Sequence, residues 1–429
     1  MPRKPAALPK ARAAALECLE STLAQGLDVQ EALDRILEGA SLSPRDAALA
    51  TELVYGSLRL KGRVEFLLSR FLRRPAGLPE RVRLGLVLAG YELLFLSRIP
   101  AYASVNWAVD LARAEAGERV AGVANAVLRR LFRLGRAAFD PDRFKENSNL
   151  AALFSRFYSC PEWIVRLWLS AYGRERAEQY LTAQIAPPAL GLWLNPAHPE
   201  TPGLAESLRR HPACLAHDGF GLAFAAGTKL SGLGLEGHGA VQRQSFAARQ
   251  ALLALCPTAW PTPVWDACAG RGNKTRVLIE QGVAPVYASD IRPGRVAALA
   301  KALPDVPAFV AAADRPAPLQ NPVGTVLLDL PCSGLGVLSR RPDAKWKRRP
   351  EDLAGVIDLQ GRILDQAFAA LRPGGRLAVL TCTLNPDENE GLIERFVRRT
   401  ASARLETAFA TPPESKLGEF FFAALLARA

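Results

Sequence analysis

The sequence predicts a three-part protein: an all-α helical bundle, a small α+β region and a C-terminal α/β domain. Apolar residues recur at helical spacing from about residue 11 to residue 134, and from about residue 241 short apolar strands alternate with helices. Such alternation is typical of a parallel, doubly wound sheet. A chain of 429 residues has room for several domains, and we expect them at 1–140, 150–240 and 241–429.

The N-terminal segment contains a helix start and a basic helix end. Ser43 and Pro44 precede one apolar-periodic run, as expected at a helix N-terminus. Within residues 122–136, four arginines crowd one helix end: Arg129, Arg130, Arg133 and Arg136. Such a cluster either contacts phosphates or is an ordinary solvated face, and both interpretations stay open here.

The composition is that of a soluble, basic protein. Hydrophobic residues make up 49% of the chain and charged residues 22%. Lys and Arg total 54 against 42 Asp and Glu, which gives a net charge of +12. This excess favours a polyanionic partner, most simply a nucleic acid, although an indifferent basic surface is an equal alternative on charge alone.

Cysteine and histidine usage predicts neither disulfides nor a metal site. The seven cysteines form no CxxC pair, and the four histidines are scattered without ligand spacing. An odd, dispersed set of cysteines fits a reducing compartment. No apolar run has signal-peptide or membrane-spanning character. We therefore expect a cytoplasmic protein without a metal and without membrane association.

Chemically active residues follow two apolar strands in the C-terminal domain. Asp329 and Cys332 come directly after one strand, and Cys382 comes directly after another. The carboxyl ends of strands in open α/β sheets are where ligands bind. A carboxylate and two thiols delivered to one sheet edge suggest nucleophilic chemistry.

A glycine-containing turn after the first strand of this domain predicts a cofactor loop. The segment Asp266–Thr275 reads DACAGRGNKT, which is neither a GxGxxG fingerprint nor a Walker A loop. Asp290 and Asp314 are expected at the ends of the next two strands, where acidic side chains bind a ribose and an adenine amino group. Acidic groups without a phosphate loop fit S-adenosylmethionine, whose sulfonium is cationic. Each Asp alone would more often be a helix N-cap.

Two thiols and a carboxylate beside a methyl donor point to methylation of an unreactive pyrimidine carbon. C5 of cytosine becomes nucleophilic only after a nucleophile adds to C6, and a thiolate does this well. A carboxyl group at N3 stabilises the resulting enamine, and a base must later remove the C5 proton.

At this point the chain resembles a known family. LDLPCSGLGVLSRRPDAKW and LTCTLNPDENE resemble motifs IV and VI of the Sun-type RNA cytosine-C5 methyltransferases, DACAGRGNKT resembles their motif I, and GEFFFAALL resembles their closing strand. RDAALATELVYGSLRL and GVANAVLRRL resemble the NusB-like domain of the bacterial Sun/Fmu branch, which methylates a cytosine in 16S ribosomal RNA. The resemblance covers essentially the whole chain and implies a Rossmann-like class I methyltransferase fold behind a NusB-like domain.

The resemblance also implies roles for individual residues. Cys382 would be the nucleophile that adds to C6, Cys332 would assist product release, and Asp329 would contact the cytosine ring near the methyl donor. S-adenosylmethionine would be held by Asp290, Asp314, Asp329 and the loop residues Cys268, Ala269, Gly270, Arg271, Gly272, Asn273 and Lys274. Lys345 would contact RNA or support the site. DNA cytosine methyltransferases use the Pro-Cys thiol as nucleophile, so an exchange of the two cysteine roles stays open.

The chain departs from the family pattern in three places. Motif I usually reads AAPGGKT, whereas Gly270–Asn273 replace its centre, and Asn273 is expected to tolerate a left-handed turn. Arg243 stands where an acid is usual, and Trp193 stands where Arg is usual. These changes leave the chemistry in place and bear on cofactor affinity and RNA contacts.

The predicted function is methylation of C5 of a cytosine in 16S rRNA, either free or in an early pre-ribosomal particle, by a monomeric enzyme. One alternative is the same chemistry on tRNA. Another is a non-catalytic RNA-binding or ribosome assembly factor with a decayed site, and a third treats both cysteines as ordinary buried thiols.

Overall fold

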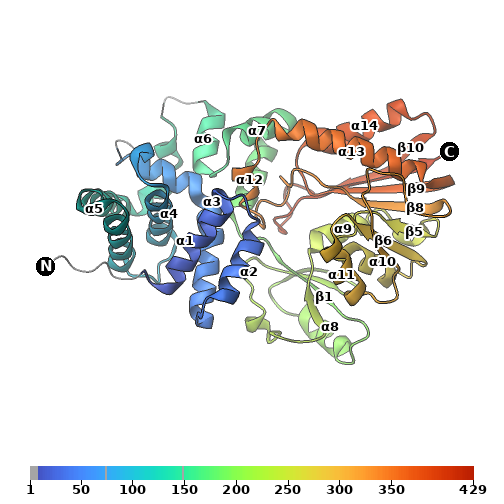
Figure 1. Cartoon of the computed structure of the whole chain (residues 1–429), viewed down its shortest axis with the longest axis horizontal. Coiled ribbons are helices and arrows are strands. Elements are labelled where there is room, and N and C mark those ends of the chain that lie inside the picture. Colours follow the sequence, from blue (N-terminus) through green and yellow to red (C-terminus); the bar gives the residue numbers. More distant parts are fainter. Residues whose placement is uncertain (1–7, 73–74, 147–148) are drawn as a thin grey trace. The chain divides into compact units, whose positions relative to one another are not determined.

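The computed structural model describes residues 8–72, 75–146 and 149–429, so the first residues of the basic N-terminus and part of the polar break near residue 148 lie outside it. The chain divides into two compact units. One contains Met1–Ile185 and the short segment Arg341–Lys347, and the other contains Ala186–Arg340 and Arg348–Ala429. Figure 1 labels the elements of both.

The first unit is built of helices, as the apolar periodicity predicts. They are α1 (Lys10–Leu23), α2 (Val29–Gly39), α3 (Pro44–Ser69), α4 (Glu80–Phe95), α5 (Ala101–Arg133), α6 (Leu150–Phe157) and α7 (Glu162–Ile185). The N-cap Ser43 accepts a hydrogen bond from the Asp46 backbone N–H at 3.1 Å, and Pro44 occupies the first helical position. Helix α5 is interrupted at Gly117, whose φ of 80° only glycine adopts without strain.

A segment from far along the chain completes this helical unit. Residues 341–347, which contain the short helix α12 (Ala344–Lys347), pack with the N-terminal helices. The Trp346 indole donates to the Leu58 carbonyl at 2.7 Å, and Lys347 Nζ donates to the Leu27 carbonyl at 2.8 Å. Sequence periodicity assigned this stretch to the methyltransferase-like part, and long-range packing places it with the helices instead.

The second unit begins with a small antiparallel sheet. Its strands are β1 (Leu190–Leu194), β2 (Cys214–Asp218), β3 (Gly221–Phe224) and β4 (Val241–Arg243), in the order β2-β3-β1-β4. Helix α8 (Thr201–Arg209) lies between β1 and β2 in the chain, and its Ala205 and Leu208 share a core with Leu192 and Phe224. This is the predicted small α+β fold.

The larger sheet has seven strands in the order β10-β11-β9-β8-β5-β6-β7. The strands are β5 (Val264–Asp266), β6 (Val286–Asp290), β7 (Ala308–Val310), β8 (Val323–Asp329), β9 (Leu371–Thr381), β10 (Ala403–Ala410) and β11 (Phe422–Arg428). The pairs among β5 to β9 are parallel, whereas β11 runs antiparallel to both β9 and β10. The parallel sheet that the strand–helix alternation indicates therefore ends in an antiparallel edge, where β10 and β11 follow one another as an antiparallel pair.

Helices cover both faces of this sheet, as Figure 1 shows. They are α9 (Phe246–Leu253), α10 (Asn273–Glu280) and α11 (Pro293–Ala302) on one face, and α13 (Asp352–Ala369) and α14 (Glu390–Arg399) on the other. Successive residues of β8 pack on opposite faces of the sheet. Leu327 packs with α9 and α10, whereas Val326 and Leu328 pack with α13 and α14. This two-sided burial explains why the strands read as continuous apolar runs.

Two further features concern the described residues only. No helix among them is long and apolar enough to cross a membrane. No group of three or more His, Cys, Asp and Glu side chains within the same residues is placed to hold a metal ion. All seven cysteines are free thiols.

Candidate active site

The order of the large sheet reverses at β5, and this places the candidate site. From β5 the chain proceeds outward to β6 and β7 on one side, and then returns to β8 and β9 on the other. Ligands of open α/β sheets bind in the crevice outside the carboxyl ends of the strands at such a switch point. Asp266, Asp290 and Asp329 are the last residues of β5, β6 and β8, so their side chains are delivered to this edge.

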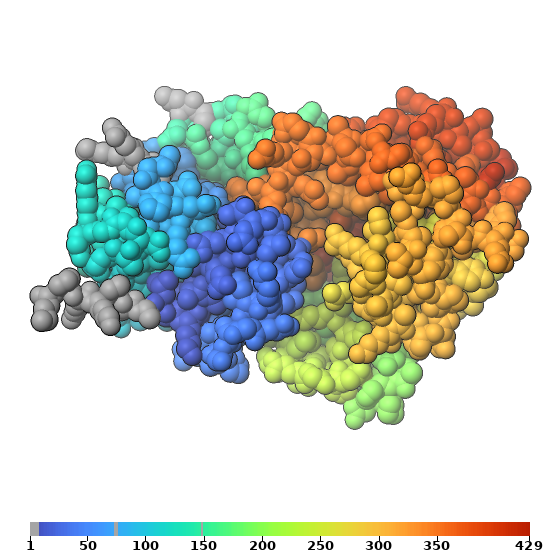
Figure 2. All heavy atoms as spheres, in the orientation of Figure 1, coloured from blue at the N-terminus to red at the C-terminus, as the bar shows by residue number. Residues whose placement is uncertain are grey.

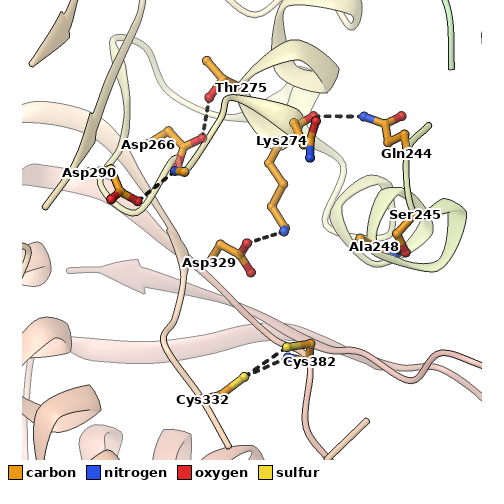
Figure 3. A network of polar contacts seen from close by, with 12 residues as sticks. Gln244, Ser245, Ala248, Asp266, Lys274, Thr275, Asp290, Asp329, Cys332 and Cys382 are labelled. Atoms are coloured by element: carbon orange, nitrogen blue, oxygen red, sulfur yellow. Dashed lines mark hydrogen bonds and ion pairs between the residues drawn. The ribbon is translucent and has the colours of Figure 1, made fainter. Parts of the chain in front are cut away.

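The two predicted cysteines meet at the same edge. Cys332 follows β8 and Cys382 follows β9, and their Sγ atoms are 3.2 Å apart. The Cys382 backbone N–H points at the Cys332 sulfur at 3.4 Å, so the thiols belong to one local arrangement. Figure 3 shows the two sulfurs facing one another. Both side chains are only partly buried, and a substrate can therefore reach them.

The environment separates the two sulfurs chemically. The hydrogen bond with Cys382, burial, and the nearby Glu388 carboxylate all raise the pKa of the Cys332 thiol well above its ordinary value. Cys332 therefore keeps its proton over a wider pH range than a free cysteine does. A protonated Cys332 can donate a hydrogen bond to the sulfur of Cys382.

Gly336 fixes the loop that follows Cys332. Its N–H donates to the Cys382 carbonyl and its own carbonyl accepts from the Phe420 N–H, both at 2.9 Å. A Cβ atom at this position would lie 2.2 Å from the Phe420 carbonyl oxygen, so only glycine allows this close approach.

Asp329 and Lys274 form an ion pair between the loop after β5 and the thiols (Figure 3). Lys274 Nζ lies 2.5 Å from Asp329 Oδ2. Burial lowers the pKa of Lys274, but the attraction of Asp329 outweighs it and the net shift is upward. Lys274 was predicted to hold the cofactor. In the structure its ammonium pairs with Asp329, the last residue of β8.

The predicted cofactor loop forms a tight turn before α10. Its left-handed positions are Gly270 (φ 57°) and Gly272 (φ 82°), and Asn273 is the first residue of the helix. The expected tolerance of Asn273 for left-handed backbone is therefore not needed. The Asn273 carbonyl accepts a hydrogen bond from Gln244 Nε2 at 3.0 Å, which ties the turn to the segment between β4 and α9.

Asp290 supports this loop and keeps acceptor capacity. Its two oxygens accept the backbone N–H groups of Gly270 at 3.0 Å and of Arg292 at 2.9 Å. Each carboxylate oxygen has a second lone pair, which is what a ribose hydroxyl pair needs. Two apolar side chains, Ile291 (64% exposed) and Val310 (53% exposed), stand at the ends of the neighbouring strands β6 and β7. Sequence reasoning missed this apolar pair, although apolar residues at strand ends were a usable signal.

Asp314 does not end a strand. Strand β7 stops at Val310, four residues earlier, and Asp314 lies in the following coil with Arg362 Nε 3.7 Å from its carboxylate. The alanine-rich run after Val310 has little β preference, so the expected strand is shorter than the apolar pattern suggested.

Asp266 is buried and Cys268 is partly buried at the start of this loop. Asp266 is fully buried and accepts a hydrogen bond from the Thr275 hydroxyl at 2.7 Å, and burial raises its pKa to about 7. Burial and the neighbouring carboxylates Asp266 and Asp329 also raise the pKa of the Cys268 thiol. Cys268 is therefore a poor nucleophile beside the cofactor loop.

Two further residues that the sequence singled out, Lys345 and Trp193, make structural contacts within their own units. Lys345 is fully buried in the helical unit, where its amine donates to the Arg59 carbonyl at 2.9 Å and to Gln184 Oε1 at 2.7 Å. A direct contact of this amine with RNA is excluded by its burial. Trp193 donates from its indole to Glu280 at 3.0 Å and lies under the Arg276 guanidinium, so it ties β1 to α10.

Comparisons with known proteins identify the family of the chain. The family model described as "16S rRNA methyltransferase RsmB/F" matches residues 252–426, and the "NusB family" model matches residues 9–133. A probable ribosomal RNA small subunit methyltransferase B of Synechocystis is 32% identical over 90% of this chain and 88% of its own length. The ribosomal RNA small subunit methyltransferase B of Vibrio cholerae is 31% identical over 94% of this chain and 95% of its own length.

A solved structure shares the whole fold. The crystal structure of a protein named PH0851 covers 99% of this chain and 100% of its own, with a TM-score of 0.73 and 19% sequence identity. At that identity the likeness concerns the fold alone. The predicted combination of a NusB-like helical region, a small sheet domain and a Rossmann-like methyltransferase sheet is thereby confirmed.

Proposed function

The chain belongs to the RsmB/F family of 16S rRNA methyltransferases, and on that premise we propose that it methylates C5 of a cytosine through a covalent bond between Cys382 and C6. The observation that carries this proposal is the thiol pair, with its Sγ atoms 3.2 Å apart at the ends of two neighbouring parallel strands. C5 and C6 are adjacent ring atoms. Two sulfurs this close can serve them both, one as nucleophile and one as base.

Cys382 acts first. Its thiolate forms a bond to C6, and the electrons of the C5=C6 double bond move toward C5 and the N3 edge of the ring. Asp329 contacts that edge. The ammonium of Lys274, whose Nζ lies 2.5 Å from Asp329 Oδ2, offsets the negative charge that gathers there. When bound, S-adenosylmethionine supplies the electrophilic methyl group that the activated C5 accepts.

Cys332 then resolves the adduct. It takes the proton from C5, the electron pair of that C–H bond restores the C5=C6 double bond, and the S–C6 bond breaks so that Cys382 leaves as a thiolate. Cys332 must be ionised for this step. Once the Cys382 sulfur is bonded to carbon, the hydrogen bond between the two sulfurs is lost, and with it the largest cause of the raised Cys332 pKa. Adduct formation thus prepares the base.

The residues around the turn before α10 suit S-adenosylmethionine. Asp290 offers free lone pairs for a ribose, and Ile291 with Val310 offers an apolar surface for an adenine ring. Gly270 and Gly272 bring backbone close to the ligand without side chains in the way. A partly acidic site without a phosphate-binding loop suits the cationic sulfonium of S-adenosylmethionine better than it suits a nucleoside triphosphate.

A basic and aromatic surface on α5 supports RNA as the partner. Arg129, Phe132 and Arg133 share one helix face at spacings of three and four residues, and the Phe132 ring is 51% exposed. Within the described residues, none of the nearby arginines 129, 130, 133 and 136 has an acidic partner. Figure 2 shows α5 at the outside of the helical unit. Unpaired arginines bind phosphates, and exposed aromatic rings stack on unpaired bases.

The test is methyl transfer from labelled S-adenosylmethionine to unmodified 16S rRNA, with bulk tRNA in parallel and with bisulfite sequencing of the product. The proposal predicts one protected cytosine in 16S rRNA, and loss of that signal in Cys382→Ala. Free RNA and an early small-subunit particle are compared to find the preferred form. Label in tRNA alone would keep the chemistry and overturn the substrate. No label in either RNA, together with no binding of S-adenosylmethionine, would favour a non-catalytic RNA-binding factor.

A further inference from the structure

Glu388 is a buried carboxylate directly behind the two thiols, and the proposed chemistry does not use it. It ends the short 3-10 turn η6 (Pro386–Glu388), and none of its surface is exposed. Its Oε2 atom accepts from the Ser333 backbone N–H at 2.8 Å and from Gln360 Nε2 at 3.1 Å. Its Oε1 atom accepts from the Ser333 hydroxyl, from Asn385 Nδ2 at 3.1 Å and from the Thr383 hydroxyl at 3.4 Å.

These donors come from both cysteine-bearing turns. Ser333 is the residue after Cys332, and Thr383 is the residue after Cys382. The Ser333 and Thr383 hydroxyls are also within 2.6 Å of each other. Gln360 of α13 extends the arrangement to the other side of Cys332, since its Nε2 also donates to the Pro331 carbonyl at 2.9 Å. One carboxylate therefore connects the turns after β8 and β9.

The charge balance distinguishes Glu388 from Glu280 and Glu419, two other acids of the same unit whose side chains are buried. Glu280 and Glu419 pair with Arg249 and Arg340, whereas no Lys, Arg or His of the described residues pairs with Glu388. It is held by neutral donors alone. A buried carboxylate without a cation is costly compared with an apolar side chain of the same shape, so stability alone is a weak reason for its presence.

Geometry supplies a stronger reason. In the proposed reaction the two sulfurs serve adjacent ring atoms, and Cys332 must reach the C5 proton while Cys382 is bonded to C6. A misplacement of about 1 Å in such a reaction can cost about 10²-fold in rate. The Sγ–Sγ distance of 3.2 Å depends on the relative position of two turns, and Glu388 accepts hydrogen bonds from the residue that follows each cysteine.

We infer that Glu388 is a positioning residue: it holds Cys332 against Cys382 and thereby sets the rate at which the covalent adduct is resolved. This inference rests on the proposed function. It predicts that loss of the Glu388 carboxylate slows adduct decay more than adduct formation. Adduct decay needs both sulfurs correctly placed, whereas adduct formation needs Cys382 alone.

The test is Glu388→Gln in the full-length protein, with adduct formation and adduct decay measured separately in single-turnover reactions on labelled 16S rRNA. The amide keeps the shape but replaces one acceptor by an NH2 group that faces N–H or O–H donors. We expect adduct decay to slow by at least about tenfold and adduct formation by less than about threefold, so that adduct accumulates although Cys332 is present. Glu280→Gln, which alters another buried acid of the same unit, should leave the ratio of the two rates unchanged.

A double variant separates positioning from general destabilisation. If Glu388 acts through Cys332, then adding Glu388→Gln to Cys332→Ala should not slow adduct decay further, because the residue that is positioned is already gone. Equal slowing of both half-reactions by Glu388→Gln, or additive effects in the double variant, would overturn the inference.

Two controls keep the outcome interpretable. If Glu388→Gln does not fold, Thr383→Val removes one donor to the same carboxylate with little change in shape, and it should raise the adduct fraction in the same direction. An unchanged adduct fraction in that variant would count against the inference. Failure of the proposed function would look different, because Cys332→Ala itself would then form no adduct at all.

Discussion

Replacing Lys345 by methionine tests whether a cation is truly buried in the helical unit. Its amine has no exposed surface and makes two hydrogen bonds, to the Arg59 carbonyl and to Gln184. Burial, partly countered by Cys160 and reinforced by the positive charges of Arg59, Lys61 and Arg63, lowers the pKa of Lys345 to about 7. From the ordinary value of 10.5, this difference corresponds to roughly 5 kcal/mol of unfavourable interaction for the charged amine.

The sign of the pH dependence follows from the two states. Between about pH 7 and 10.5 the unfolded chain keeps the Lys345 proton and the folded chain has released it. Stability rises with pH wherever the unfolded state binds more protons, with a slope of about 1.4 kcal/mol per pH unit for one group. Lys345 therefore makes its largest unfavourable contribution below about pH 7, and that contribution shrinks as the pH rises through this window.

The assay is urea unfolding of wild type and Lys345→Met at several pH values from 6 to 9, followed by helical circular dichroism. From pH 6 to pH 9, the free energy of unfolding of the wild type should rise by about 3 kcal/mol more than that of the variant. The comparison cancels pH-independent costs of the substitution, such as loss of the hydrogen bonds to the Arg59 carbonyl and to Gln184. The buried Cys160 thiol, whose pKa burial raises to about 12, is present in both proteins, so its contribution cancels in the comparison. Parallel curves for the two proteins would refute the assignment of Lys345 as a buried, titrating cation.

Three further predictions follow from the site and the helical unit. Lys274→Met removes the cation 2.5 Å from Asp329 and should lower kcat/KM by about 10²-fold in methyl transfer assays, and an unchanged value would show that the ion pair is not catalytic. Asp266→Asn should reduce the loss of stability that occurs as the pH rises from about 4 to about 7, because in this range the folded state keeps the Asp266 proton and the unfolded state releases it. Urea unfolding curves at both pH values measure the free energy of unfolding. Replacing Arg130 and Arg133 by Gln should reduce the salt dependence of 16S rRNA affinity by about one unit of log–log slope per arginine, and an unchanged slope would place the RNA elsewhere.

The sequence was sufficient to predict the site residues that directly end or follow a buried strand. Cys332, Cys382 and Asp329 follow continuous apolar strands, and a polar residue after a buried strand is placed at the sheet edge by the strand itself. The glycine turn before α10 was equally readable, because left-handed positions require Gly270 and Gly272. The proposed roles of these residues, and the expected domain boundaries near 140, 150 and 240, stay predictions.

The features that escaped sequence reasoning depend on long-range packing. Residues 341–347 have no local signal that separates them from the preceding loop, yet they complete the helical unit through Lys345 and Trp346. The direction of β11 was also hidden, because an apolar strand reads the same whether it runs parallel or antiparallel. Glu388 looked like one acid in the polar run NPDENE, and only the fold shows that it lies behind both thiols.

The central claim is that Cys382 forms the covalent bond and Cys332 releases it, and one gel tests it most directly. Cys332→Ala, Cys382→Ala and the double variant are each incubated with labelled unmodified 16S rRNA and S-adenosylmethionine, and then separated under denaturing conditions. We expect a stable protein–RNA adduct in Cys332→Ala and none in the other two. An adduct in Cys382→Ala, or its absence from Cys332→Ala, would contradict the assignment of the two thiols.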